Sequence, residues 1–270
     1  MEDFKVSQSL LKAFTSYKSG EECGLVVKAR YFDKVNFPPT EAQQLGCWFE
    51  YILTGSLPKN GEVPQAEYVN KGKDLAAKYR TMKIHADRFK KILDHYGFGI
   101  VGKGERLIID DAEGTLDLRV VALRDIHVND IFIPKGSAGI IDIKTTGLIN
   151  DKWSPFGWDT ERLPEKEGLM IQPVMYKYLA KKLFGKDHFF FFLIFSNTNE
   201  FDEKLILVDV AESKVEQMET IIRNSKKVIL REYEDGFEAI PSIQRCKDCA
   251  LKSTCSFFQD IPQAEVVHYG

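Results

Sequence analysis

The segment AGIIDIKTT, residues 138–146, limits the possible folds more than any other part of the sequence. Its apolar and β-branched residues predict a short buried strand. Side chains alternate across a strand, so Asp142 and Lys144 would lie on the same face. A buried carboxylate and a buried ammonium are costly unless they are paired or bind a metal. The fold must therefore supply partners for these two side chains from other segments.

The composition is that of a globular protein. The chain has 270 residues, of which 44% are hydrophobic and 12% aromatic, which allows one large domain. The formal net charge of −3 does not by itself indicate a nucleic-acid partner. The chain contains no apolar run of membrane-spanning length, and its start lacks the layout of a signal peptide. We therefore expect a cytoplasmic protein without membrane association, whose five cysteines are free, metal-bound or cluster-bound rather than paired in disulfides.

The order of the predicted elements indicates the fold class. Ser7 is a possible N-cap for the first helix, and Thr40 and Gln43 have the spacing of a capping box at the second. Helices are predicted over residues 7–18, 40–54, 65–96, 169–184 and 213–230, and strands over 106–110, 115–123, 138–146, 188–196 and 204–212. This order predicts an α/β protein with a mixed central β-sheet flanked by helices and with an N-terminal helical portion.

A basic helical insertion is predicted over residues 56–106, within a single domain spanning 1–270. Its cations are Lys71, Lys73, Lys78, Arg80, Lys83, Arg88, Lys90, Lys91, Lys103 and Arg106. Such a surface can neutralise DNA phosphates. A solvated amphipathic helix explains the same pattern equally well.

A second carboxylate, Asp117, lies early in the strand predicted over 115–123. If this strand neighbours the strand at 138–146, two carboxylates converge beside Lys144 and repel each other. A divalent cation removes that conflict, and the Ile143 carbonyl and the Glu50 carboxylate are further oxygen ligands for it. Water on such a cation becomes an attacking hydroxide. Lys144 would orient that water or stabilise charge on a phosphate.

Four motifs occur in an order that resembles the PD-(D/E)xK nuclease superfamily, specifically its RecB-like exonuclease branch. They are GCWFE at 46–50, GTLD at 114–117, IIDIKTTG at 140–147 and QPVMY at 172–176. The resemblance implies a restriction-endonuclease-like core that cleaves DNA with Mg²⁺ or Mn²⁺. The sequence departs from the branch at Glu50, where the branch frequently has His.

The resemblance also implies a role for each matching residue. Glu50, Asp117 and Asp142 would bind the metal, and Lys144 would serve the attacking water. Gln172 and Tyr176, four residues apart on one helix face, would hold the DNA strand or Lys144. Each motif alone has a structural explanation: Asp117 as a charge at a hairpin edge, Glu50 on a solvated helix face, Tyr176 as a packing residue and Gln172 in solvent.

Three of the five cysteines crowd into CKDCALKSTC, as Cys246, Cys249 and Cys255. A tetrahedral metal or a cubane cluster needs a fourth thiolate, for which Cys23 and Cys47 are the candidates. The layout resembles RecB-like nucleases with an iron–sulfur cluster, including CRISPR-associated exonucleases and some helicase–nuclease complexes. That resemblance implies a [4Fe–4S] cluster on Cys23 and the three later cysteines, joining the two ends of the domain. Zn²⁺ also suits four thiolates.

The sequence therefore predicts a metal-dependent DNA nuclease, an exonuclease acting on single-stranded DNA or DNA ends. The alternative is a non-cleaving DNA-binding or scaffold protein with a nuclease-like fold. The aromatic residues of KWSPFGW, 152–158, would stack on unpaired bases or pin the loop to the core. Partner proteins from recombination, replication or defence systems, in a phage or a prokaryote, are expected by analogy only.

Overall fold

A computed structural model describes residues 4–58, 61–65, 73–154 and 156–260. The chain divides into two compact units. The terminal unit comprises residues 1–38 and 220–270, and the sheet unit comprises residues 39–219. That the two units act as one nuclease domain over 1–270 stays a prediction. No helix in the described part of the chain is long and apolar enough to cross a membrane.

The sheet unit contains most of the regular structure. Its helices are α3 (Glu41–Thr54), α4 (Lys73–Tyr96), a short 3-10 helix (Leu163–Glu165) and α5 (Glu167–Phe184). Its strands are β2 (Phe98–Ile108), β3 (Ala112–Ala122), β4 (Ile126–Val128), β5 (Ile131–Ile133), β6 (Ala138–Thr146), β7 (Phe189–Ser196) and β8 (Glu203–Leu207). Helix α6 (Glu212–Asp235) begins in the sheet unit and ends in the terminal unit.

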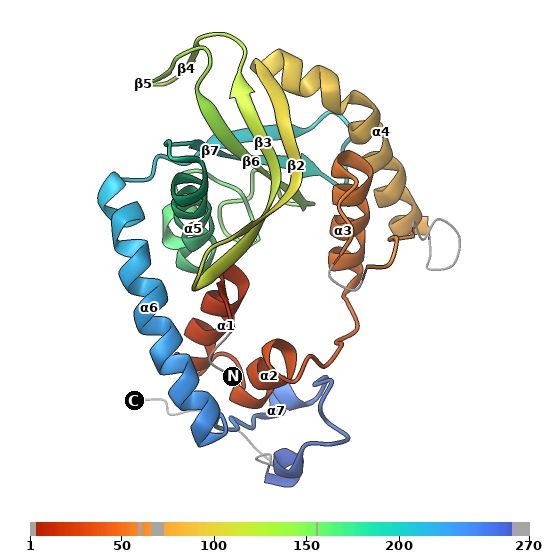
Figure 1. Cartoon of the computed structure of the whole chain (residues 1–270). Helices are drawn as coiled ribbons and strands as arrows, with labels where there is room; N and C mark the ends of the chain where they lie inside the picture. The colour runs from red at the N-terminus through yellow and green to blue at the C-terminus, as the bar shows by residue number, and fades with distance from the viewer. Residues whose placement is uncertain (1–3, 59–60, 66–72, 155, 261–270) are drawn as a thin grey trace, which may run out of the picture. The chain divides into compact units, whose positions relative to one another are not determined.

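The main sheet has mixed topology. Strand β2 pairs with β3, β3 with β6, and β7 with β8, all antiparallel, whereas β6 and β7 run parallel. Helices α3 and α4 lie on one side of this sheet and α5 on the other (Figure 1). The predicted fold class, a mixed central sheet flanked by helices, is confirmed.

Strand β7, with the sequence FFFFLIFS, is buried because helices cover both faces of the sheet. Phe191, Leu193 and Phe195 belong to the core beneath α3 and α4. On the other face, the ring centroid of Phe190 lies 6.4 Å from that of Tyr176, and the ring centroid of Phe192 lies 5.2 Å from that of Trp158. The prediction of a buried strand here is confirmed.

The helix boundaries follow the capping signals of the sequence. Thr40 and Gln43 form the predicted capping box at the start of α3, and Gly55 ends that helix in the left-handed conformation. The hydroxyl of Ser7 accepts a hydrogen bond from the Leu10 N–H at the start of α1 (Gln8–Lys18). Both predicted N-caps are therefore confirmed.

Two local predictions are wrong, and two short elements were not predicted. The insertion predicted as helical over 56–106 ends in a strand, because Phe98–Ile108 is β2, and α4 is its helix among the residues that the structure describes. The turn of the β2–β3 hairpin lies at 109–111, whereas the strands predicted over 106–110 and 115–123 place it at 111–114. Helix α2 (Gly24–Tyr31) was not predicted, because its N-cap residue Cys23 makes no side-chain capping bond and its sequence carries no other start signal. The two-stranded β4–β5 hairpin was also missed, since three-residue strands are too short to show a period.

Several cations of the predicted basic surface contact other groups of the protein. Lys71 lies outside the described residues, and so does the side chain of Lys73. Arg106 pairs with Glu113 at 2.6 Å, and Lys103 donates to the Leu53 carbonyl at 2.8 Å. Lys83 pairs with an Asp one turn later on α4. Several of these cations are thus engaged by the protein itself.

The terminal unit is built from helices. It contains α1, α2, the end of α6, α7 (Ile243–Cys246) and a 3-10 helix (Ser256–Asp260), together with the two-residue strand β1 (Val6–Ser7). Its core consists of Leu10, Ala13, Phe14, Tyr17, Val27, Ile229 and Phe237. The Tyr17 hydroxyl donates to Glu232 at 2.8 Å and accepts from the Glu238 N–H at 3.2 Å. Tyr17 thereby holds the first helix against a segment more than 200 residues later.

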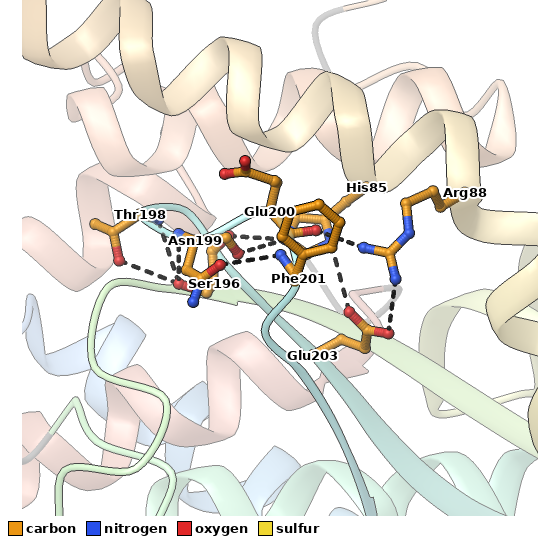
Figure 2. Close-up of polar contacts among 8 residues, drawn as sticks. All are labelled: His85, Arg88, Ser196, Thr198, Asn199, Glu200, Phe201 and Glu203. Carbon is orange, nitrogen blue, oxygen red and sulfur yellow. Dashed lines mark hydrogen bonds and ion pairs between the residues drawn. The ribbon is translucent and has the colours of Figure 1, made fainter.

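A buried polar network joins α4 to the turn between β7 and β8 (Figure 2). His85 is fully buried, and its Nε2 lies 3.0 Å from the Ser196 carbonyl and 3.1 Å from the Asn199 carbonyl. That nitrogen therefore carries the proton. The other ring nitrogen, Nδ1, has no hydrogen-bond partner and faces Glu203 Oε2 across 3.9 Å. Arg88 completes the network, because its guanidinium donates a hydrogen bond to the Glu200 carbonyl at 2.5 Å.

Burial lowers the pKa of His85 below its ordinary value, although the two carbonyls and Glu203 oppose that shift. The neutral ring therefore contributes stability above about pH 6.5, and this contribution is lost as the pH falls below that value. The unfolding free energy of the wild type should fall more steeply below about pH 6.5 than that of His85→Gln. One proton limits the difference to at most about 1.4 kcal/mol per pH unit. Denaturant unfolding at several pH values measures it.

The exposed His95 at the end of α4 provides a matched control. His95→Gln should keep the wild-type pH slope. Equal slopes for His85→Gln and the wild type would contradict the assignment of a buried neutral imidazole.

Candidate active site

Asp117 and Asp142 lie where the pairing of β3 with β6 ends. The antiparallel ladder runs from Val121 and Ala138 to Leu118 and Ile141, and it stops one residue before the two carboxylates. Beyond the ladder, the N–H of Ile143 donates to Asp117 Oδ2 at 2.6 Å. A side chain thus replaces the backbone acceptor that a continued ladder would provide. The neighbouring strands bring the two carboxylates together as predicted.

Asp142 is held from two sides. Its side chain is 2% exposed, and its Oδ1 accepts a 2.5 Å hydrogen bond from Gln172 Nε2 on α5. Its Oδ2 lies 2.5 Å from Lys144 Nζ, an ion pair without the alignment of a hydrogen bond. Asp142 and Lys144 therefore share one face of β6, as the alternation of the strand predicts.

Three carboxylates influence one another at this site. Burial raises the pKa of Asp117 well above its ordinary value, and the charges of Asp142 and Glu50 raise it further. Burial also raises the pKa of Asp142, although Lys144 opposes the shift. The pKa of Glu50 is raised by burial and then by Asp142. Glu50, on α3, is thus part of the same electrostatic group rather than a solvated helix residue.

Lys144 is the cation of the group. Burial lowers its pKa, but the charges of Asp142, Asp117 and Glu50 outweigh that effect, so that the pKa of Lys144 is raised. Its side chain keeps 29% of its surface exposed, so Lys144 is only partly buried. A charged ammonium has no free lone pair, so it can donate hydrogen bonds but cannot take up a proton. Lys144 is therefore suited to binding anionic groups.

Gln172 and Tyr176 lie on one buried face of α5, with exposures of 6% and 8%. Gln172 contacts Asp142, whereas the nuclease resemblance implied that it holds Lys144 or the DNA strand. Burial, followed by the charges of Asp142 and Asp117, raises the pKa of Tyr176, so its phenol stays protonated. The interpretation of Gln172 as a solvent-facing residue is wrong.

Gly114, the first residue of the GTLD motif, allows α5 to approach β3. A Cβ at this position would lie 2.9 Å from Tyr176 Cε1 and 3.0 Å from Leu179 Cδ1. Glycine is therefore required by space, not by an unusual backbone angle. Gly46 of the GCWFE motif differs, because the nearest atom to a Cβ there is Thr145 Oγ1 at 3.9 Å. A Cβ would therefore meet no steric clash at Gly46.

The charges and ligand types of the carboxylate site fit a divalent cation. Three carboxylates face one ammonium, which leaves an excess of negative charge, and Mg²⁺ and Mn²⁺ favour carboxylate oxygens. Among the residues that the structure describes, however, no group of three or more His, Cys, Asp or Glu side chains is arranged so that it could hold a metal ion. The oxygens of Asp142 face Lys144 and Gln172 instead. Metal binding requires rotation of these side chains, and the ligand set, including the Ile143 carbonyl, stays a prediction.

The cysteines predicted to bind a cluster all belong to the terminal unit, whereas Cys47 is exposed on α3 of the sheet unit. All five are free thiols. The Ile240 N–H lies 3.4 Å from Cys23 Sγ, and the Ser242 N–H lies 3.4 Å from Cys246 Sγ. The Gly24 N–H donates to the Glu238 carbonyl at 3.1 Å, which fixes the Cys23 segment beside the segment leading to Cys246. Cys249 and Cys255 follow in the turns after α7.

The most useful contact that sequence reasoning missed is the Ile143 N–H to Asp117 bond. Its donor is a backbone N–H, which every residue except proline has, so the residue types in the sequence do not indicate this bond. The His85 network was also missed, because a single His on an apolar helix face carries no signal of its partners.

Replacing Asp117 by Asn should stabilise the metal-free protein. Asp117 has a raised pKa, so its charged form opposes folding at neutral pH, and a neutral amide removes that repulsion while its oxygen still accepts from the Ile143 N–H. We expect the melting temperature to rise by about 2–4 °C, corresponding to about 1 kcal/mol in a chain of this size. Thermal unfolding in EDTA measures the change.

The exposed Asp130, in the β4–β5 turn, serves as the matched control, and Asp130→Asn should leave the melting temperature nearly unchanged. Added Mn²⁺ should stabilise the wild type more than Asp117→Asn. A lower melting temperature for Asp117→Asn in EDTA would contradict the proposed charge repulsion.

Comparison with solved structures supports the fold. A crystal structure of a protein called "Putative exonuclease", from Eubacterium rectale, matches with a TM-score of 0.56 and 16% sequence identity. The match covers 93% of this chain and 88% of the other. No family model matches the sequence, and no curated protein matches it. The chain therefore shares the fold of that protein.

Proposed function

We propose that the protein is a metal-dependent nuclease that hydrolyses phosphodiester bonds in DNA, as an exonuclease acting on single strands or DNA ends. The proposal is carried by one observation: Asp117 and Asp142 meet at the end of the β3–β6 ladder beside Lys144, whose ammonium lies 2.5 Å from Asp142 Oδ2, and the Glu50 carboxylate on α3 acts on the same group. Buried, strongly perturbed carboxylates of this kind are frequent at functional sites. The fold shared with the Eubacterium rectale protein agrees with the proposal.

Glu50, Asp117, Asp142 and the Ile143 carbonyl would hold Mg²⁺ or Mn²⁺. The cation, when bound, lowers the pKa of water and neutralises charge on the phosphate. Gln172 donates to Asp142 Oδ1 and orients that carboxylate. Lys144, partly exposed and positively charged, donates hydrogen bonds to a phosphate oxygen or to the attacking water. The phenol of Tyr176 stays neutral and maintains the packing of α5 against β3.

A second candidate is a DNA-binding protein or scaffold that does not cleave. It is favoured by the engagement of both Asp142 oxygens within the protein, by Lys144 and Gln172. In that case the same lysine would bind phosphate without hydrolysis. Partner proteins from recombination, replication or defence systems also stay a prediction.

We further propose that Cys23, Cys246, Cys249 and Cys255 bind a [4Fe–4S] cluster, with Zn²⁺ as the alternative occupant. Backbone N–H groups directed at Cys23 and Cys246 stabilise negative charge on sulfur, which suits thiolate ligands of either occupant. In the structure these four thiols are not arranged so that they could hold a metal ion. Binding of a cluster or Zn²⁺ would therefore require them to move closer together. The cluster would join the first and last segments of the terminal unit.

End-labelled single-stranded and duplex DNA, incubated with Mg²⁺ or Mn²⁺, tests the nuclease proposal. Wild-type protein should shorten the labelled strands, and Asp142→Ala should reduce the rate to about one-thousandth or less while DNA binding is retained. The Asp130→Asn variant should cleave at the wild-type rate. Absence of cleavage of any DNA form by the wild type would favour the non-cleaving candidate.

Anaerobic purification tests the cluster. Broad absorbance near about 400 nm, with about four irons per chain, is expected for the wild type and should be lost in Cys23→Ser. Cys47→Ser is the matched control and should keep the absorbance, because Cys47 lies in the sheet unit. Colourless protein with one zinc per chain would assign the site to Zn²⁺ instead.

A further inference from the structure

The loop after β6 carries two of the most exposed aromatic side chains of the described residues. Trp153 is 77% exposed and Phe156 is 75% exposed. Exposure of large aromatic side chains near a functional site indicates a binding surface when the side chains have no packing role. A packing role for Trp153 and Phe156 would be to hold this loop in place.

The loop is held by other groups. Asp151 Oδ1 accepts from the N–H groups of Trp153 at 2.7 Å and Ser154 at 2.8 Å. Gly157 packs so tightly that a Cβ there would lie 1.7 Å from the Asp151 carbonyl oxygen. The Thr146 hydroxyl donates to the Phe156 carbonyl at 3.4 Å. Backbone contacts thus define the loop without either exposed ring.

Trp158 supplies the apolar anchor. It is 8% exposed, and its ring centroid lies 5.2 Å from that of Phe192 on β7. Lys204 Nζ donates to the Trp158 carbonyl at 2.9 Å. The expectation that aromatic residues pin this loop is therefore correct for Trp158 alone, and Trp153 and Phe156 are left for another role.

The anchor also connects the loop to the candidate active site. Phe192 is the register partner of Asp142 across β6 and β7. The Lys144 ammonium lies 5.9 Å from the centroid of the same Phe192 ring. Trp158 and Lys144 thus contact one ring, and the exposed aromatic residues lie within five residues of that contact.

The loop also carries a positive charge. The Lys152 ammonium lies 5.1 Å from the centroid of the Trp153 ring. An aromatic face with a cation beside it matches a nucleotide, which offers a base for stacking and a phosphate for the charge. In duplex DNA the bases are already stacked in the helix interior, so only unpaired bases can use such a surface.

We propose that Trp153 and Phe156 form a stacking platform for unpaired bases, which delivers single-stranded DNA to the site at Asp142 and Lys144. This inference rests on the proposed function for its substrate, and it selects single strands over blunt duplex ends. Neither residue belongs to the four motifs on which the nuclease resemblance depends.

Intrinsic fluorescence provides a direct test, because the other two tryptophans, Trp48 and Trp158, are buried. A short oligothymidylate added in EDTA should quench the fluorescence of wild-type protein, and a blunt duplex of equal length should not. Trp153→Ala should lose this quenching and bind the labelled oligonucleotide about five- to one-hundred-fold more weakly in an anisotropy titration. Phe156→Ala should weaken binding but keep the quenching.

Phe132 on β5 is the matched control, since it is also exposed, at 52%, and lies on the separate β4–β5 hairpin. Phe132→Ala should bind and quench as the wild type does. Wild-type affinity in Trp153→Ala, equal quenching by the duplex, or no quenching in the wild type would overturn the platform. Cleavage assays separate the two proposals. If the wild type cleaves DNA and Trp153→Ala binds DNA with wild-type affinity, the platform is wrong but the nuclease proposal stands. If the wild type is quenched by the oligonucleotide but cleaves no DNA, the nuclease proposal is wrong but the platform stands.

Discussion

The burial of Asp142 is the constraint on which the rest of the sheet unit depends. A carboxylate at 2% exposure between apolar strands is tolerated only because Lys144 pairs with one oxygen and Gln172 donates to the other. Gln172 reaches it from α5, and α5 comes close enough only because Gly114 leaves room for Tyr176. The contact between Gln172 and Asp142 thus accounts for the position of the helix and for the glycine in β3.

The same arrangement leaves the site under electrostatic stress. One ammonium faces three carboxylates, and burial raises the pKa of each carboxylate. Proteins tolerate such repulsion mainly at functional sites, where a ligand or cation relieves it. A fold that served only stability would place apolar side chains at these positions, since packed hydrophobic residues frequently replace buried ion pairs without loss.

The parallel pairing of β6 and β7 places the loops that follow both strands at one end of the sheet, and the two loops differ in kind. The Asn197 N–H donates to the Thr146 carbonyl at 2.8 Å, which joins them at their roots. The loop after β7 is held on α4 by the buried ring of His85. The loop after β6 is held by its own backbone and by Trp158, so Trp153 and Phe156 remain exposed. Rigid support beneath exposed aromatic side chains lowers the entropy lost on binding a flexible strand.

The sequence alone determined most of the long elements, because their periodicity and capping signals are local, although it missed the first part of β2. Local signals were sufficient to predict these elements: the caps at Ser7 and at Thr40 with Gln43, the apolar run of β7 and the alternation in β6. It also determined that Asp142 and Lys144 share a face. The β4–β5 hairpin escaped prediction because three-residue strands show no period, and α2 escaped it because no capping signal marks its start. The tertiary structure decided which groups meet: Gln172 with Asp142 rather than Lys144, the Ile143 N–H with Asp117, and Trp158 rather than Trp153 as the loop anchor. These contacts join segments distant in sequence or involve backbone groups, so no local pattern contains them.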